Sequence, residues 1–254
     1  MSAERRPVLV TIPISHYCEK ARWALDRAGI DYEERRHLPA LHRVAVRRAG
    51  GRLTAPVLVC DEAGVLDESA DIVCYADERA PAGRGTIPED PTLAAEARAL
   101  ADDYDERLGP ATRLWVYHQM IPHPELVTAS MTAGVPGWQR RTFKVGHRAL
   151  GAVISRVLRI DDDTVVDAER EFRAIFADVD DRLADGRRYL VGDAFSIADL
   201  TFAALAAPLV APPEYGVRLP AVDELPPRMR TVVREHRDTP AGEHALRMFA
   251  TERR

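Results

Sequence analysis

The chain opens on two hydrophobic patterns of different period. Residues 8–12 form an apolar, β-branched run that stops at Pro13, which is typical of a buried strand. Residues 17–28 then carry apolar side chains at roughly helical spacing, and Gly29 follows as a residue suited to ending a helix. This segment therefore predicts a strand, a turn and a helix.

The following residues continue in short elements. Residues 30–37 alternate weakly, as a strand does, and residues 38–48 predict a short basic helix. Two apolar runs, 56–60 and 65–66, flank a turn and predict a hairpin, while residues 69–78 predict a closing helix. The order β-α-β-α-β-β-α fits a small α/β domain over residues 1–79.

The pattern changes after residue 79. Residues 80–91 are rich in Pro, Gly and Arg, as an exposed linker is. Helical periodicity then dominates residues 92–254 and predicts an all-α domain. Its expected helices span residues 92–120, 139–159, 164–184, 197–209 and 227–236.

Composition narrows the class of protein. Of 254 residues, 46% are hydrophobic and 30% are charged, which fits a globular fold, and the formal net charge is −5. Lys20 and Lys144 are the only lysines, so the basic side is almost wholly arginine. Because no arginine run is joined to interleaved aromatic residues, nucleic-acid binding is not expected.

The sequence contains no clear membrane-spanning segment and no clear secretory segment. The most apolar late stretch, residues 200–210, is too short to span a bilayer and contains Pro208. Three cysteines without a Cys-x-x-Cys pair, and no secretory segment before the first strand, indicate a reducing cytoplasm. No histidine or cysteine spacing supports a metal site, since Cys60 and Cys74 have no ligand-type neighbours.

The candidate chemistry lies where the first strand passes into the first helix, in Pro-Ile-Ser-His-Tyr-Cys-Glu-Lys-Ala-Arg. The unpaired N–H groups and partial positive charge of a helix N-terminus favour an anion such as a thiolate. The hydroxyl of Ser15 can donate a hydrogen bond to such a sulfur and lower its pKa, or it can simply cap the helix. Cys18 is an alternative reactive thiol. The residues alone leave these alternatives open.

This segment resembles the glutathione S-transferase family and, more distantly, glutaredoxins. Ser15 to Cys18 stand where glutaredoxins carry Cys-x-x-Cys, and Lys20, Arg22 and Leu25 look like the family's first helix. Residues 189–200, Tyr-Leu-Val-Gly-Asp-Ala-Phe-Ser-Ile-Ala-Asp-Leu, closely resemble the family's signature before its buried core helix. The resemblance implies a thioredoxin-like front domain and an all-helical back domain. Ser196 and Asp199 have capping-box spacing and are interpreted as structural.

The resemblance also implies thiol-peptide contacts at two further points. Residues 54–58 look like the family's loop before the third strand, where Pro56 is cis and Ala55 pairs with the peptide backbone. Glu68 and Ser69 resemble the pair that holds the γ-glutamyl end of the ligand. Arg52 is a candidate for the glycyl carboxylate, because guanidinium pairs bidentately with carboxylates.

Acceptor-site candidates come from both halves. His16 and Tyr17 share the first helical turn with the thiol site, and Trp115, Tyr117 and His118 close the first back-half helix, which lines the acceptor site in the family. Each can equally belong to the interdomain core. Residues 115–163 are interrupted by Pro and Gly and form a long insert relative to a compact family member, expected to cap the pocket.

The function implied is transfer of an activated thiolate to a small hydrophobic electrophile, in a detoxification role. Glutathione or another low-molecular-weight thiol is the cosubstrate, with no tightly bound cofactor and no metal. The arginine-rich composition suggests a GC-rich bacterial genome, which leaves the identity of the thiol open. The alternatives are a non-catalytic binding or scaffold protein and a glutaredoxin-like reductase that uses Cys18. The resemblance implies a homodimer.

Overall fold

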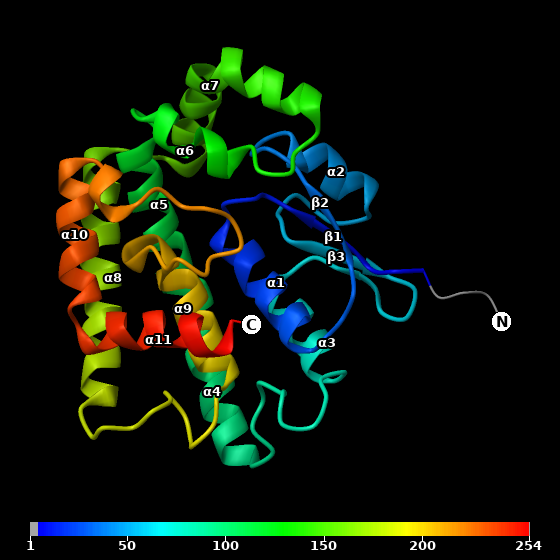
Figure 1. The fold of residues 1–254 in the computed structure, drawn as a ribbon, viewed down its shortest axis with the longest axis vertical. Helices are drawn as coiled ribbons and strands as arrows, with labels where there is room; N and C mark the ends of the chain where they lie inside the picture. The colour runs from blue at the N-terminus through cyan, green and yellow to red at the C-terminus, as the bar shows by residue number, and fades with distance from the viewer. Residues whose placement is uncertain (1–4, 254) are drawn as a thin grey trace.

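The computed structural model describes residues 5–253, and it places a small sheet with three helices beside a larger helical bundle (Figure 1). The sheet has the order β2-β1-β3-β4. Its strands are β1 (Val8–Thr11), β2 (Glu33–Arg36), β3 (Val57–Cys60) and β4 (Gly64–Leu66). Strand β2 is parallel to β1, whereas β3 is antiparallel to both β1 and β4. The expected order of strands and helices in the front half is confirmed.

The two faces of this sheet follow the alternation of its side chains. Leu9 of β1 lies opposite Leu58 of β3, and both belong to the main core with α1 (His16–Arg27) and α3 (Ser69–Asp77). Val10 lies opposite Val57, and this pair instead packs on α2 (His42–Arg48). Since successive residues of a strand point to opposite faces, one register places α1 and α3 on one side and α2 on the other.

The back half is helical. Its elements are α4 (Pro91–Asp103), the π-helical turn η1 (Tyr104–Leu108), α5 (Gly109–Met120), α6 (Pro124–Met131), α7 (Gly137–Leu158), α8 (Asp162–Leu183), α9 (Ile197–Val210), the 3₁₀ turn η2 (Val222–Glu224), α10 (Pro227–Arg237) and α11 (Pro240–Glu252). The single helix expected over residues 92–120 is interrupted by η1, and α6 and α11 were not predicted.

Helix α9 is the centre of the bundle. Nearly all of its residues are buried, because it is apolar on every face and packs against α1, α4, α5 and α11. Asp199 accepts hydrogen bonds from the backbone N–H of Ser196 at 2.9 Å and from that of Leu190 at 2.8 Å. The structural role assigned to Ser196 and Asp199 is consistent with these contacts.

The segment expected as an exposed linker is anchored at one residue. Thr86 is buried, and its backbone N–H donates to the side chain of Asp77 at the end of α3. Its carbonyl accepts from the N–H of Ile197 at the start of α9 at 2.6 Å. The connection between the halves is therefore fixed at its middle by both of them.

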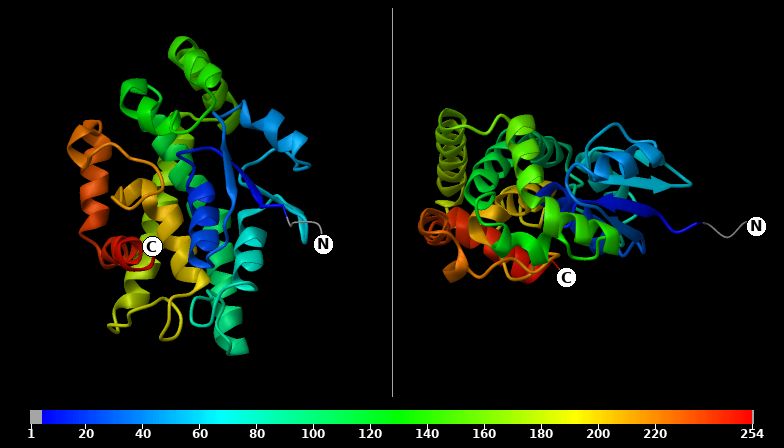
Figure 2. Two further views of the ribbon diagram at one scale, coloured as in Figure 1. Left: turned by 45° about the vertical axis from the view of Figure 1, so that its right-hand side comes forward. Right: turned by 90° about the horizontal axis from the view of Figure 1, so that it is seen from above.

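The insert over residues 115–163 forms α6 and α7, which lie at one end of the molecule near α2 (Figures 1 and 2). Gln139 of α7 is buried, and its Oε1 accepts from the N–H of Leu38 at 2.8 Å. Leu38 also packs with Met131 and Phe143. The insert therefore bridges the two halves at this end.

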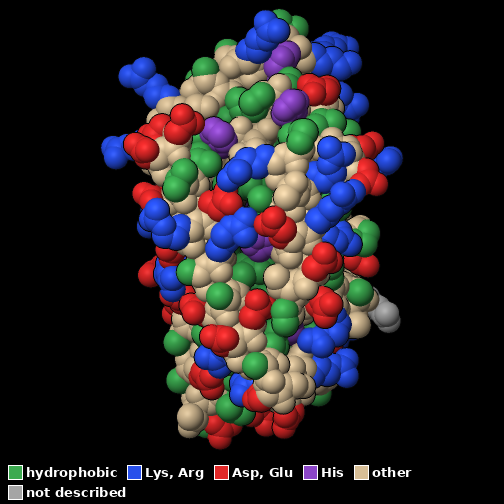
Figure 3. Space-filling model, turned by 90° about the vertical axis from the view of Figure 1, so that its left-hand side faces the viewer, with side chains coloured by type: hydrophobic (Ala, Val, Ile, Leu, Met, Phe, Trp, Pro, Cys, Tyr) green, Lys and Arg blue, Asp and Glu red, His purple; other side chains and the backbone are tan. Residues whose placement is uncertain are grey.

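The surface over α8 and α10 carries acidic and basic side chains side by side (Figure 3). Glu169, for example, pairs with Arg173 at 2.9 Å and with Arg228 at 2.6 Å. Across residues 5–253, none of the helices has the length and apolar character needed to cross a bilayer.

Candidate functional site

A cavity of about 520 Å³ lies between the two halves. This volume falls within the roughly 300–1,000 Å³ of small-molecule sites. The front half lines it with the start of α1 and the loops around residues 39–43 and 53–55, and the back half lines it with α5, α6, α7 and the loop that follows α9. Most of the lining side chains are apolar, so the polar ones mark where chemistry is possible.

Ser15 is the N-cap of α1 and borders this cavity. Its backbone is extended, with φ −70° and ψ 126°, and its Oγ accepts a hydrogen bond from the N–H of Cys18 at 3.4 Å. A hydroxyl that accepts one hydrogen bond still has its O–H to donate. Ser15 can therefore cap the helix and donate a hydrogen bond to a ligand at the same time.

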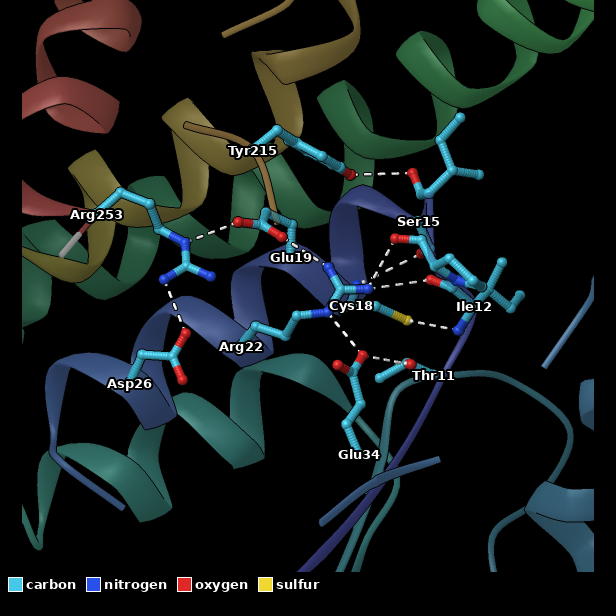
Figure 4. Close-up of polar contacts among 12 residues, drawn as sticks. Thr11, Ile12, Ser15, Cys18, Glu19, Arg22, Asp26, Glu34, Tyr215 and Arg253 are labelled. Atoms are coloured by element: carbon cyan, nitrogen blue, oxygen red, sulfur yellow. Dashed lines mark hydrogen bonds and ion pairs between the residues drawn. The ribbon is translucent and has the colours of Figure 1, made fainter. Parts of the chain in front are cut away.

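Cys18 is fully buried beneath that cap (Figure 4). Its Sγ accepts from the N–H of Ile12 at 3.4 Å. Burial raises the pKa of the Cys18 thiol, although Arg22 and these hydrogen bonds act in the opposite direction. A buried thiol with a raised pKa is inert, which opposes the alternative in which Cys18 is the reactive group.

His16 is held in one tautomer by the back half. Its Nε2 lies 3.1 Å from the carbonyl oxygen of Gly109, which only accepts, so Nε2 carries the proton. Burial, aided by the charge of Arg113, lowers the pKa of His16 to about 3. His16 is therefore a neutral residue of the cavity wall at physiological pH.

This low pKa predicts a pH-dependent stability. The pKa of His16 is about 3 in the fold and near 6.5 in the unfolded chain, so the unfolded state binds the extra proton. The contribution of His16 to the free energy of unfolding is complete above about pH 6.5 and declines as the pH falls towards 3. In a His16→Gln variant, urea unfolding at several pH values is expected to give a shallower loss over this window.

The matched control is His123→Gln, because the side chain of His123 is 42% exposed. This variant is expected to keep the slope of the wild type. Equal slopes for the wild type and His16→Gln contradict the assignment of this titration to His16.

Tyr17 joins α1 to the π-helical turn. Its hydroxyl donates to the carbonyl of Asp105 at 2.8 Å, and Gly109 is required beside it because a Cβ there would overlap the tyrosine oxygen. Burial raises the pKa of Tyr17, with the charge of Arg113 opposing and those of Asp105 and Glu68 adding to the shift. Tyr17 lines the cavity and at the same time belongs to the junction between the halves.

The buried ion pair at the same junction involves Lys20 and Asp105. Lys20 Nζ lies 2.5 Å from Asp105 Oδ2, and the lysine side chain is fully buried. Burial raises the pKa of Asp105, against the effect of Lys20. This pair helps to fix α1 against η1, and so positions the first turn of α1 relative to α5.

The bond between Ala55 and Pro56 is cis, as the resemblance implied. Thr54 and Ala55 line the cavity, whereas Pro56 is buried at the start of β3. Thr54 and Ala55 therefore border the same cavity as Ser15.

Arg52 has partners other than the one expected. Its Nε lies 2.8 Å from Asp67 and its Nη2 lies 2.6 Å from Glu68, and none of the three lines the cavity. The hydrogen bond from Arg52 lowers the pKa of Asp67. In this structure the exposed Arg52 guanidinium pairs with two carboxylates and does not face the cavity.

Ser69 begins α3 and is buried directly after Glu68. Glu68 is close enough to Tyr17 to contribute to the rise in its pKa. Neither Glu68 nor Ser69 lines the cavity itself.

The back-half candidates divide by helix face. Tyr117 lines the cavity, and burial raises its pKa. Trp115 and His118 do not line it: Trp115 is fully buried, with its Nε1 donating to Glu169 at 3.1 Å, and His118 faces Asp162 at 3.8 Å. The expectation for these two residues is corrected, because they lie on the other side of α5.

Several lining residues were missed from the sequence. Arg113, Val116, Met120 and Ile121 line the cavity from α5, and their spacing relative to Tyr117 is that of one helix face. The signal that could have found them is this periodicity, counted from Tyr117. From α7, the lining includes Phe143, His147 and Ile154.

The loop after α9 closes one side of the site. Tyr215 lines the cavity, and its hydroxyl donates to the carbonyl of Ile14 at 3.0 Å (Figure 4). The segment of residues 211–225 is therefore tied to the residue before Ser15. Among residues 5–253, no group of three or more His, Cys, Asp or Glu side chains is placed to hold a metal ion.

Comparison with protein-family models gives two matches. Residues 9–85 match the glutathione S-transferase N-terminal domain, and residues 136–235 match the glutathione S-transferase C-terminal domain. Comparison with curated protein sequences gives no match. The two domain matches agree with the thioredoxin-like and all-helical halves of the structure.

Solved structures with the same fold cover nearly the whole chain. The β-etherase LigF from Sphingobium sp. strain SYK-6 has a TM-score of 0.58 and 15% identity, over 96% of this chain and 99% of that one. The Tau class glutathione S-transferase MiGSTU from mango, Mangifera indica, has a TM-score of 0.53 and 20% identity, over 98% and 97%. A glutathione S-transferase from Methylobacterium radiotolerans, in complex with glutathione sulfonate, has a TM-score of 0.54 and 19% identity, over 95% of each chain. At these identities the likeness establishes the fold.

Proposed function

Because this chain belongs to the glutathione S-transferase family, we propose that it transfers the thiolate of a low-molecular-weight thiol to an apolar electrophile. The observation that carries the proposal is the place of Ser15, whose hydroxyl stands at the N-terminus of α1 and borders a largely apolar cavity. A nucleophile held at Ser15 and an electrophile held in the cavity would meet there.

The proposed chemistry uses two features of this helix start. The N-terminus of α1 favours negative charge, and the O–H of Ser15 donates to the sulfur of the bound thiol. Both lower the pKa of that thiol, which releases its proton to solvent and becomes a thiolate. The thiolate then forms the sulfur–carbon bond, and in a substitution the leaving group departs with its electron pair.

For the thiol we propose glutathione first and another low-molecular-weight thiol as the alternative. Ala55, at the cis peptide bond, would pair with the peptide backbone, and Glu68 and Ser69 would receive its γ-glutamyl end. Arg52 would contribute only after exchanging one of its present carboxylate partners. Support for glutathione comes from the related Methylobacterium protein, which holds glutathione sulfonate.

The reductase alternative has less support, because Cys18 is fully buried and its pKa is raised by that burial. A non-catalytic binding protein would use the same cavity without turnover. These two alternatives are separated from the proposal by activity measurements on the same preparation.

The test is a thermal-shift screen against glutathione, cysteine and mycothiol, followed by turnover of a panel of aromatic electrophiles with any thiol that binds. We expect one thiol to raise the melting temperature in a concentration-dependent way and to support conjugation. Binding without turnover on the whole panel would favour the binding protein. Disulfide reduction that disappears in Cys18→Ser would favour the reductase, and no stabilisation by any thiol would contradict the proposal.

We also propose that the protein works in the cytoplasm as a homodimer, as the family resemblance implies, in which the front half of one chain meets the back half of the other. Light scattering coupled to size-exclusion chromatography is expected to give about twice the 28.2 kDa of one chain. A mass of one chain at micromolar concentration contradicts this arrangement.

A further inference from the structure

Arg113 of α5 is a charged side chain without a protein partner in the cavity wall. Its Nε is buried and has no hydrogen-bond partner, and no carboxylate of residues 5–253 lies within 4.0 Å of its guanidinium. The guanidinium carbon lies 5.9 Å from the centre of the Tyr17 ring. Arg113 therefore brings a positive charge into the site that no carboxylate of the described residues pairs with.

Two arginines near Arg113 differ from it in having carboxylate partners. Arg22 is buried against Glu19 at 2.6 Å and Glu34 at 2.8 Å, and Arg107 contacts Asp103 at 3.0 Å. A buried polar group without a partner costs free energy, and a charged one costs more. Arg113 is half-buried and its Nε is buried without a partner, so an anion bound in the cavity would be stabilised by this guanidinium.

The wall beyond Arg113 is apolar. Met120 and Ile121 continue the same face of α5, Ile154 faces the cavity from α7, and Leu225 and Met229 line it near the start of α10. A ligand that fills this space therefore needs an apolar body with negative charge at one end. From the front half, Thr54 and Ala55 line the same cavity.

We propose that Arg113 binds a carboxylate of the acceptor substrate, so that the preferred acceptor is an elongated apolar electrophile carrying a carboxylic acid. The planar fork of a guanidinium matches a carboxylate with two parallel hydrogen bonds. The ring of Tyr17 supports the cation from one side. This inference rests on the proposed function, since it names the second substrate of the same site.

The test measures binding without any thiol, so that it does not depend on turnover. Dansylaminoundecanoic acid and its methyl ester are titrated into the protein by fluorescence. The two probes differ only in the negative charge. We expect the wild type to prefer the acid, and Arg113→Met to weaken binding of the acid about 10-fold or more while leaving the ester within about 2-fold.

Two further variants make the result specific. Arg113→Lys keeps the charge without the fork and is expected to recover part of the affinity for the acid. Arg43 lines the same cavity but is exposed, so Arg43→Met is expected to leave the ratio of acid to ester within about 2-fold. If Arg113→Met does not fold, Arg113→Lys and Arg113→Gln provide the comparison.

The proposal is overturned if the wild type does not prefer the acid, if Arg113→Met weakens both probes equally, or if Arg43→Met causes the same loss. It is also overturned if Arg113→Met raises the KM for the thiol and leaves that for an acidic acceptor unchanged, because the guanidinium then serves the thiol. Selective binding of the acid in a protein that turns over no thiol would contradict the proposed function and leave the site at Arg113 intact.

Discussion

A Glu19→Ala variant is expected to lose about 3–5 kcal/mol of its free energy of unfolding, because it leaves two buried guanidinium groups without their shared partner. Glu19 Oε2 accepts from Arg22 Nη1 at 2.6 Å, and Oε1 accepts from Arg253 Nε at 2.7 Å (Figure 4). Glu19 is fully buried and Arg22 is 2% exposed. The lost carboxylate is therefore removed from bulk solvent, which would otherwise screen the two guanidinium charges.

The remaining contacts of the two arginines limit the loss without removing it. Arg22 keeps Glu34, and Arg253 keeps Asp26 at 2.8 Å. Burial lowers the pKa of Arg22, and the charges of Glu19 and Glu34 raise it above its usual value. Arg253 follows α11, so the loss would also loosen the end of the chain from α1.

The measurement is urea unfolding followed by circular dichroism. Asp223→Ala is the matched control, since Asp223 pairs with Arg234 through side chains that are 81% and 60% exposed. That variant is expected to stay within about 1 kcal/mol of the wild type. Equal losses of unfolding free energy in the two variants would mean that the contribution of Glu19 to stability does not come from its burial.

The front half could be predicted from the sequence because its signals are local. Ser15 caps α1, and Gly29 adopts a φ of +70° just after the helix, where a side chain would be strained. Each signal lies within a few residues of the boundary that it sets. The elements between residues 8 and 78 therefore appear in the expected order.

The sequence pattern missed helices and a helix break in the back half, either because a local signal had two meanings or because the cause is a tertiary contact. Proline ends a helix and also begins one, so Pro124, which stands in the first turn of α6, was interpreted only as an interruption. Helix α11 carries a readable start in Thr239 and Pro240, and Thr239 Oγ1 accepts from the N–H of Gly242 at 3.1 Å. The break at η1 adjoins Gly109, which is packed against Tyr17 from the other half, and such a contact leaves no local pattern.

The site shows the same limit. Ser15, Ala55 and Tyr117 could be placed at the cavity because they stand at an element boundary or on a lining helix face. Arg113 could not be singled out in this way, because the chain is rich in arginine. Its proposed role depends on its lack of a partner, and that is visible only in the folded structure. The pairing of Glu19 with Arg253 likewise joins residues far apart in the sequence.

A Ser15→Ala variant is expected to lower kcat/KM for conjugation about 100-fold or more, because it removes a hydrogen-bond donor aimed at developing negative charge. The bound thiol would then keep a pKa nearer to that of the free thiol. The activity of the variant should therefore rise with pH over a higher range than that of the wild type. The measurement is the pH profile of kcat/KM, recorded with the thiol identified in the binding screen.

The difficulty with this variant is that Ser15 also caps α1, so its loss costs about 1 kcal/mol of stability by itself. Ser15→Asp separates the two roles, because aspartate caps a helix as well as serine does but offers a negative charge in place of a donor. Ser15→Asp is therefore expected to unfold like the wild type and to lack activity, whereas Ser15→Thr retains the hydroxyl and part of the activity. Full activity in Ser15→Asp would mean that Ser15 serves the helix alone.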